Sequence, residues 1–180
     1  KYVTNNNPEV IQYLNLGKYC SEVVSLNRNL YLASSSIWQS EEQIIDISYG
    51  FEHTLLLTKQ GKVYSWGTGS RGQLGHGELS DEKFPRLVEA LDGVQICKIS
   101  AGGWHSCAVG KLGELYTWGW NEKGQLGLPF TKESLTESQS HIANETELYN
   151  VMFIPKLITF VNDDFEVLQI SSGDRHTVIL

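Results

Sequence analysis

Hydrophobic residues lie in short runs along most of the chain, and glycine-rich turns separate these runs. Residues 55–58 and 62–66 form two such runs, with the turn at Gln60-Gly61 between them. Two short runs rich in Leu, Val, Tyr and Trp around a turn of this kind are typical of a β-hairpin. A proline opens the next run, residues 85–88, and predicts an edge strand because proline donates no ladder hydrogen bond. Residues 96–100 alternate polar and apolar side chains, which predicts a fourth strand.

This pattern occurs twice at an offset of 52 residues, and eleven of the 26 aligned positions are identical. A third copy begins near the end of the sequence. The shared positions that we assign to the structure of the repeat are Gly50, His53, Gly61, Tyr64, Trp66, Gly67, Gly72, Gln73, Leu74, Gly75, Gly102, His105, Gly113, Tyr116, Trp118, Gly119, Gly124, Gln125, Leu126, Gly127, Gly173 and His176. A period of this size predicts a propeller, a solenoid or an array.

About four strands per unit favour a β-propeller among these architectures. We therefore expect an all-β fold, a fragment of a propeller with about two to three four-stranded blades. Residues 1–46 would be a degenerate blade or a blade remnant, and 47–100 the first clear repeat. Residues 101–172 would be the second repeat, with a polar insert at about 131–150, and 173–180 the truncated start of a third.

Residues 67–72, Gly-Thr-Gly-Ser-Arg-Gly, have the spacing of a dinucleotide-binding loop after a predicted strand. Such a loop needs a helix directly after it, whereas Gln-Leu-Gly follows here and predicts another turn. The second copy has Asn121 in place of Gly69. Glycine and asparagine are the residues that best accept positive φ. We expect a turn that returns the chain at the end of a hairpin, and no bound cofactor.

Three histidines, His53, His105 and His176, share one repeat position. Imidazole is a common metal ligand, but one histidine per blade would hold the rings too far apart to share an ion. We expect each ring to bond to backbone and to fix its own turn. The sequence contains no nucleophile–base pair, Walker loop or His-Glu-x-x-His motif. We therefore predict no catalytic and no metal-binding residues.

The tryptophans fall into two groups. Trp66 and Trp118 end equivalent strands, which predicts core positions between blades. Trp104 and Trp120 have no tryptophan counterpart in the first copy. Unrepeated aromatic residues on loops are candidate anchors for a partner protein, with packing against the insert as the alternative. Arg175 completes the set of partner-binding candidates.

Net charge limits the possible partners, and the cysteine pattern indicates the state of the thiols. The formal net charge of −7 argues against a general nucleic-acid surface, and no apolar run has the length of a membrane span. Cys20, Cys97 and Cys107 form no Cys-x-x-Cys pair and are odd in number, so we expect three buried thiols. Arg71 and Arg86 are expected to be ordinary solvated charges.

The motifs Gly-x-x-His-(Ser/Thr), Gly-x-(Val/Leu)-Tyr-x-Trp-Gly and Gly-Gln-Leu-Gly, in this order, resemble the repeat of the regulator of chromosome condensation family. The resemblance covers residues 47–180 apart from the insert. It implies a seven-bladed propeller, of which this chain would supply part. Residues 101–106, Ala-Gly-Gly-Trp-His-Ser, and 118–122, Trp-Gly-Trp-Asn-Glu, carry a closer likeness to one member.

That closer likeness implies a non-enzymatic scaffold of the nucleus and cytoplasm, linked to chromatin, whose partner is a jumonji-type oxygenase. The implied roles are in histone-methylation control, chromosome segregation and microtubule function. Two alternatives stay open. The chain could act as a guanine-nucleotide exchange factor for a small GTPase. It could also be a docking domain of a larger ubiquitin ligase or kinase.

Overall fold

The structure is a computed structural model, and it describes residues 24–26, 29–31, 37–39, 43–128, 150–160 and 165–180. These residues form strands and one short 3-10 helix. The elements are β1 (Val24–Leu26), β2 (Asn29–Tyr31), β3 (Ile37–Gln39), β4 (Ile44–Tyr49), β5 (His53–Thr58), β6 (Val63–Gly67), β7 (Glu82–Leu87), η1 (Glu89–Leu91), β8 (Ile96–Ala101), β9 (His105–Gly110), β10 (Leu115–Trp120), β11 (Val151–Ile158), β12 (Ile170–Ser172) and β13 (Thr177–Ile179).

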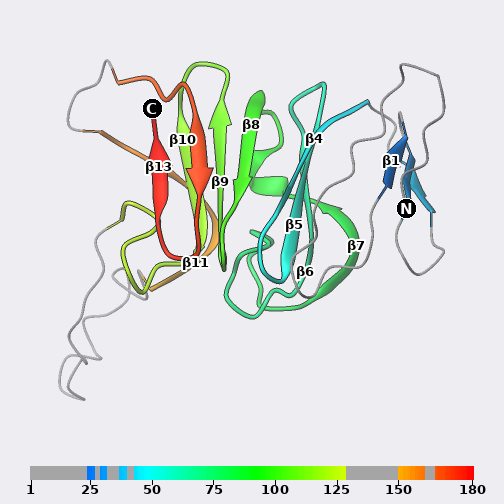
Figure 1. Cartoon of the computed structure of the whole chain (residues 1–180), viewed down its shortest axis with the longest axis horizontal. Coiled ribbons are helices and arrows are strands. Elements are labelled where there is room, and N and C mark those ends of the chain that lie inside the picture. The colour runs from blue at the N-terminus through cyan, green and yellow to red at the C-terminus, as the bar shows by residue number, and fades with distance from the viewer. Residues whose placement is uncertain (1–23, 27–28, 32–36, 40–42, 129–149, 161–164) are drawn as a thin grey trace.

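The strands form four antiparallel sheets that follow one another across the molecule in chain order (Figure 1). Two sheets have four strands each, in the orders β4-β5-β6-β7 and β8-β9-β10-β11. A three-stranded sheet, β1-β2-β3, precedes them, and the hairpin β12-β13 follows them. Up-and-down sheets of four strands, set side by side, are the blades of a β-propeller. The expected all-β fold with two to three blades is confirmed.

The β5–β6 and β9–β10 hairpins are each closed by a glycine that the sequence pattern had identified. Between β5 and β6, the N–H of Gly61 donates to the carbonyl of Thr58 at 2.9 Å, and Gly61 has a φ of 87°. Gly113 occupies the same place between β9 and β10, with a φ of 85°. Residues other than glycine rarely adopt this left-handed backbone conformation. The turn at Gln60-Gly61 is therefore confirmed in its position and its cause.

Neighbouring sheets bury both faces of the strands between them. All six residues of β5 and all six of β9 are buried, which explains why apolar residues follow one another directly at 55–57 and 107–109 rather than alternating with polar ones. Trp118 is fully buried in the core between the two four-stranded sheets, and Trp66 is buried in the core on the other face of the first sheet. Both tryptophans occupy the core, as the repeat predicted.

Two strands, β7 at the edge of its sheet and β8 at the start of the next, test further expectations from the sequence. β7 pairs only with β6, so the expected edge strand is confirmed. In β8, the register shifts between Ile96 and Lys98, and this bulge leaves both Cys97 and Lys98 exposed. The expectation of a buried Cys97 was therefore wrong, whereas Cys107 is buried. Cys20 lies outside the described residues.

Counted from its Gly-x-x-His motif, the sequence repeat is out of phase with the sheets by one strand. The strands β4, β8 and β12 each begin a sheet, and β8 contacts both of the others. The N–H of Ala101 donates to Ser48 Oγ at 2.9 Å, and the N–H of Ser172 donates to Ser100 Oγ at 2.9 Å. A unit counted from Gly50 to Ala101 therefore runs from β5 to β8, so it begins in one sheet and ends in the first strand of the next, whereas the bounds 47–100 also include the end of β4. Of the proposed insert at 131–150, all but Asn150 lies outside the described residues.

Candidate functional site

In the Gly-x-x-His turn, the histidine ring occupies the space that a β-carbon on the glycine would need. The ring of His53 lies directly over the α-carbon of Gly50, so a β-carbon there would fall 2.5 Å from His53 Nδ1 and would also collide with the carbonyl of Gly102. The same relation holds for His105, where a β-carbon on Gly102 would lie 2.6 Å from the carbonyl of Gly173. Glycine is required at these positions because the histidine ring and the next sheet both occupy the space.

The rings of His53 and His105 each bond to a hydroxyl of the next sheet, not to backbone as the sequence had suggested. His53 Nε2 lies 2.8 Å from Ser106 Oγ, and this hydroxyl donates to the carbonyl of Gln73 at 2.8 Å. The hydroxyl proton is thereby committed, so His53 must donate from Nε2. The sheets β4–β7 and β8–β11 are joined by a chain of two hydrogen bonds.

The next joint repeats this chain. His105 Nε2 lies 2.9 Å from Thr177 Oγ1, which donates to the carbonyl of Gln125 at 2.8 Å. Burial, assisted by the neighbouring His105, lowers the pKa of His53 to about 3. Burial, assisted by His176, lowers the pKa of His105 to about 4. Both rings are therefore neutral at physiological pH, and their role is to connect blades.

The Gly-Gln-Leu-Gly turn supplies the acceptors of these chains. The carbonyl of Gln73 also accepts from the indole N–H of Trp118 at 2.9 Å, and its side-chain oxygen accepts from the N–H of Arg71 at 2.8 Å. In the second copy, Gln125 accepts from the N–H of Lys123 at 2.8 Å in the same way. These contacts make the turn a structural clamp between blades.

The segment 67–72 is a turn, as expected, but the reason given for Gly69 was wrong. Gly69 is not among the glycines with positive φ; a β-carbon on it would collide with the carbonyl of Ser80. Asn121, at the equivalent position, is buried and accepts from the N–H of Leu126 at 3.0 Å. The two residues therefore meet different local requirements.

The three partner-binding candidates from the sequence lie together at one end of the sheets. Trp104 and Trp120 pack edge to face, with ring centroids 5.5 Å apart and planes at 87°. Phe51 packs against Trp104 in the same manner at 5.1 Å. The guanidinium of Arg71 lies 4.5 Å from the Trp104 centroid and 4.4 Å from that of Trp120, and the guanidinium of Arg175 lies 5.7 Å from the Trp120 centroid. We refer to these five residues as the aromatic–arginine cluster.

Topology explains why these residues meet. In antiparallel sheets, the β4–β5, β6–β7, β8–β9 and β12–β13 connections all lie at the same end. Phe51 is in the first of these, Arg71 in the second, Trp104 in the third and Arg175 in the fourth. Trp120, the last residue of β10, faces the same end. The cluster thus spans three consecutive sheets.

Sequence reasoning missed Arg71 and Phe51. Arg71 was expected to be an ordinary solvated charge, but it is half-buried between two indole rings. The repeat gave no signal for Arg71, because Lys123 occupies the equivalent position in the second copy. Arg86 on the outer strand β7 was also expected to be solvated. Its guanidinium forms ion pairs with the carboxylates of Glu78, at an N–O distance of 2.5 Å, and of Glu82, at 2.8 Å.

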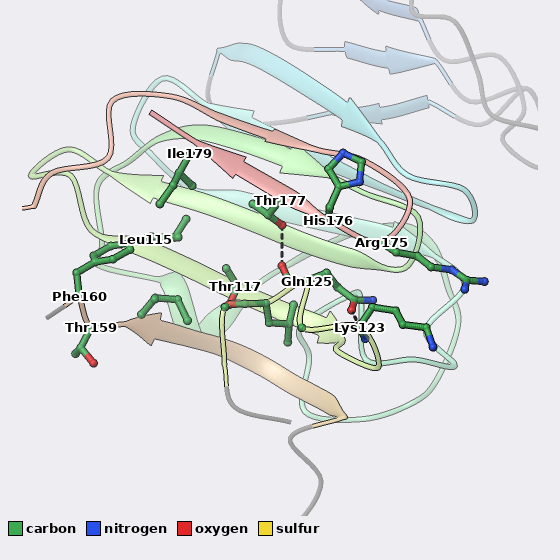
Figure 2. Close-up of a pocket in the computed structure, with 14 residues that line it drawn as sticks. Leu115, Thr117, Lys123, Gln125, Thr159, Phe160, Arg175, His176, Thr177 and Ile179 are labelled. Atoms are coloured by element: carbon green, nitrogen blue, oxygen red, sulfur yellow. Dashed lines mark hydrogen bonds between the residues drawn. The ribbon is translucent and has the colours of Figure 1, made fainter. Parts of the chain in front are cut away.

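A pocket of about 380 Å³ lies beside the cluster, between β10–β11 and the hairpin β12-β13 (Figure 2). Apolar side chains of Leu115, Ile158 and Ile179 line its interior. Figure 2 shows the side chains of Lys123 and Arg175 extending in the same direction from its rim. Arg175 therefore belongs both to this rim and to the cluster, since its guanidinium lies 5.7 Å from the Trp120 centroid.

Two further observations concern the described residues alone. They contain no group of three His, Cys, Asp or Glu side chains suited to holding a metal ion. Within the same ranges, no helix combines the length and the hydropathy of a membrane span.

Comparisons with known proteins agree with this architecture. The family model for the regulator of chromosome condensation (RCC1) repeat matches residues 60–109 and 113–180. Human RCC1 domain-containing protein 1 is 52% identical over 103 residues, which are 57% of this chain and 27% of that protein. The human E3 ubiquitin-protein ligase HERC2 is 41% identical over 91 residues, which are 51% of this chain and 2% of that protein. The chain thus spans about a quarter of the first relative's length.

Solved structures show the same fold. Human WBSCR16 superimposes with a TM-score of 0.64 and 26% identity over 87% of this chain and 36% of that one. Prp20p from Saccharomyces cerevisiae superimposes with a TM-score of 0.65 and 19% identity over 88% of this chain and 39% of that one. The family model covers more than half of the sequence, and its repeat is built into two successive sheets here. This chain belongs to the regulator of chromosome condensation (RCC1) repeat family.

Proposed function

We propose that the chain is part of a non-enzymatic protein-interaction scaffold, and that the aromatic–arginine cluster is its contact surface for a partner protein. We further propose a jumonji-type oxygenase as that partner, in a chromatin-linked role that affects histone methylation, chromosome segregation and microtubules. The protein would act in the nucleus and cytoplasm, without direct contact to nucleic acid or membrane.

The observation that supports a contact surface is the composition and support of the cluster. Tryptophan and arginine dominate the binding energy of protein interfaces, and here they alternate on one end of the molecule. Their strands are fixed by the hydrogen-bond chains from His53 and His105. A rigid set of aromatic anchors loses little conformational entropy on binding. The sequence resemblance is the reason for proposing an oxygenase as the partner.

The test is quantitative affinity capture of the tagged, longest available form of the protein from nuclear extract, followed by reconstitution with purified oxygenase. We expect the oxygenase at near-stoichiometric amounts. The double variant Trp104→Ala and Trp120→Ala should weaken reconstituted binding at least ~100-fold. Phe84→Ala provides the matched control, because Phe84 is an exposed aromatic residue on the outer strand β7.

Two results would overturn the proposal. If the control Phe84→Ala weakens binding as much as the double variant of Trp104 and Trp120 does, the cluster is not the contact surface. If a small GTPase is captured only after its nucleotide has been removed, and no oxygenase is captured, the exchange-factor alternative replaces the scaffold. The fold of each variant is checked by its thermal unfolding before binding is compared.

A further inference from the structure

We propose that Arg71 and Arg175 form a paired anchor for carboxylate groups, and that the segment they bind in the partner is an acidic peptide. This inference rests on the proposed contact surface and names the chemistry that the surface would recognise. Three independent features of the cluster support it: the free donors of Arg71, the position of Arg175, and the engagement of nearby acids.

Arg71 is a cation held in place without an anion. Its guanidinium contacts the faces of both Trp104 and Trp120, so its position is fixed by aromatic rings. Among the described residues, no carboxylate forms an ion pair with it and no acceptor bonds to its side chain. A guanidinium stacked on a ring keeps its in-plane N–H groups available, and these match the two oxygens of a carboxylate.

Arg175 repeats this situation on the other side of Trp120. It is exposed in the β12–β13 connection, and its guanidinium approaches the same indole at 5.7 Å. Within the described ranges, Arg175 also lacks an ion pair. The Lys123 side chain extends in the same direction (Figure 2). Two guanidinium groups that form no ion pair within the described ranges therefore flank one aromatic ring.

Among the described residues, the acids near the cluster form no ion pair with Arg71 or Arg175. Glu52 accepts the indole N–H of Trp104 at 3.1 Å, and Glu122 contacts Lys123 at 3.4 Å. Asp174 precedes Arg175 and is exposed. Glu52 keeps its negative charge while it accepts from the indole, but among the described residues it forms no ion pair with Arg71, so the guanidinium N–H groups stay available to an external anion.

An acidic peptide fits this surface better than a nucleic acid does. The chain as a whole has a net charge of −7, which repels a polyanion over any large contact. A peptide needs only a local contact, and the exposed ring of Phe51 beside Trp104 offers apolar area for its uncharged side chains. Charge complementarity at two points and apolar contact at a third together define an acidic segment with interspersed apolar residues.

The test is fluorescence anisotropy with a labelled peptide of repeating Glu-Phe-Glu-Ser, compared with the same peptide carrying glutamine for glutamate. We expect the glutamate peptide to bind at least ~10-fold more tightly, with an affinity that falls as salt is raised. Inorganic phosphate is the competitor. The labelled peptide is displaced either by phosphate or by unlabelled glutamate peptide, at the same ionic strength. If phosphate is as effective a competitor as the unlabelled peptide, the preference for carboxylate is refuted.

Variants locate the anchor. Arg71→Ala and Arg175→Ala should each weaken the glutamate peptide ~10-fold or more, and Arg71→Lys should fall between wild type and Arg71→Ala because it keeps the charge but loses the planar fork. Arg86→Ala is the matched control, since Arg86 is already paired with Glu78 and Glu82. Equal weakening by Arg86→Ala, or no weakening by Arg71→Ala and Arg175→Ala, overturns the proposal.

The outcome separates this inference from the proposed function. If the glutamate peptide binds through Arg71 and Arg175 but no oxygenase does, the choice of partner fails and the anchor stands. If the oxygenase binds through Trp104 and Trp120 while both arginine variants leave that binding unchanged, the anchor fails and the contact surface stands.

Discussion

Acid should destabilise the protein through the histidines that join its blades. Both rings are neutral in the folded protein, because burial lowers the pKa of His53 to about 3 and that of His105 to about 4. An unfolded histidine has a pKa near 6.5 and binds a proton as the pH falls below that value. The unfolded state then binds more protons than the folded one, so the free energy of unfolding decreases as the pH falls from about 6.5 toward about 3.

The size of the effect follows from these values. At about pH 5, protonation of unfolded His53 lowers the free energy of unfolding by about 2 kcal/mol, and His105 contributes about 2 kcal/mol more. Together, about 4 kcal/mol is a large part of the stability of a typical protein, which is about 5–15 kcal/mol. The structure explains why the folded rings resist protonation. Nε2 already carries the proton that Ser106 Oγ accepts from His53, and no acceptor among the described residues bonds to His53 Nδ1.

The assay is urea unfolding at about pH 7.5 and about pH 5, for the wild type and for His53→Gln. Glutamine keeps a donor near the position of Nε2 and removes the titration. We expect the variant to be less stable than wild type at about pH 7.5, but to lose about 2 kcal/mol less on acidification. Comparing the two losses cancels the contributions of other groups, such as Asp46, whose carboxyl pKa is raised by burial. Equal losses in wild type and variant would refute the argument.

Three further predictions test other parts of the structure. Gly102→Ala should cost ~3 kcal/mol or more in unfolding free energy, whereas Gly93→Ala, which meets no neighbour within 4 Å but has a φ of 88°, should cost only ~1–2 kcal/mol; similar costs in chemical denaturation would contradict the steric explanation. Trp118→Phe should cost ~2 kcal/mol, because it removes the indole bond to the Gly-Gln-Leu-Gly turn and part of the core; a cost near zero would show that this bond does not join the sheets. In a Cys20→Ser background, a maleimide should label Cys97 in the folded protein and Cys107 only after unfolding, because Cys97 is exposed and burial raises the pKa of the Cys107 thiol; equal labelling rates by mass spectrometry would contradict this burial pattern.

The fold could be predicted from the sequence because the repeat records contacts that every joint needs. Gly50 and His53 occur together since one makes room for the ring of the other. Trp118 bonds through its indole N–H to the carbonyl of the turn in the preceding copy, and glutamine recurs in that turn since its side-chain oxygen accepts from the backbone N–H two residues earlier. Residues with such obligatory partners appear in each copy, and the period of 52 residues then indicates a propeller.

The details that failed depend on features that a single copy does not encode. The bulge in β8 changes which residues are exposed, and it reverses the expectation for Cys97. The requirement for glycine at position 69 comes from the carbonyl of Ser80, eleven residues later, which would collide with a β-carbon there. The repeat also explains why Trp104 and Trp120 could be selected, since they depart from it, whereas Arg71 occupies a repeated cationic position and gave no such signal.

The one-strand offset between repeat and sheet has a consequence for how such a chain can change in length. Every bond chain across a joint joins one copy of the unit to the next: His53 reaches Ser106, and His105 reaches Thr177. A recombination event that inserts or deletes one whole unit therefore places the same donors opposite the same acceptors on both sides. The number of blades and the chemistry of the joints can thus be inherited separately, and loops such as the one that carries Arg71 can diverge in each copy while the joints stay the same.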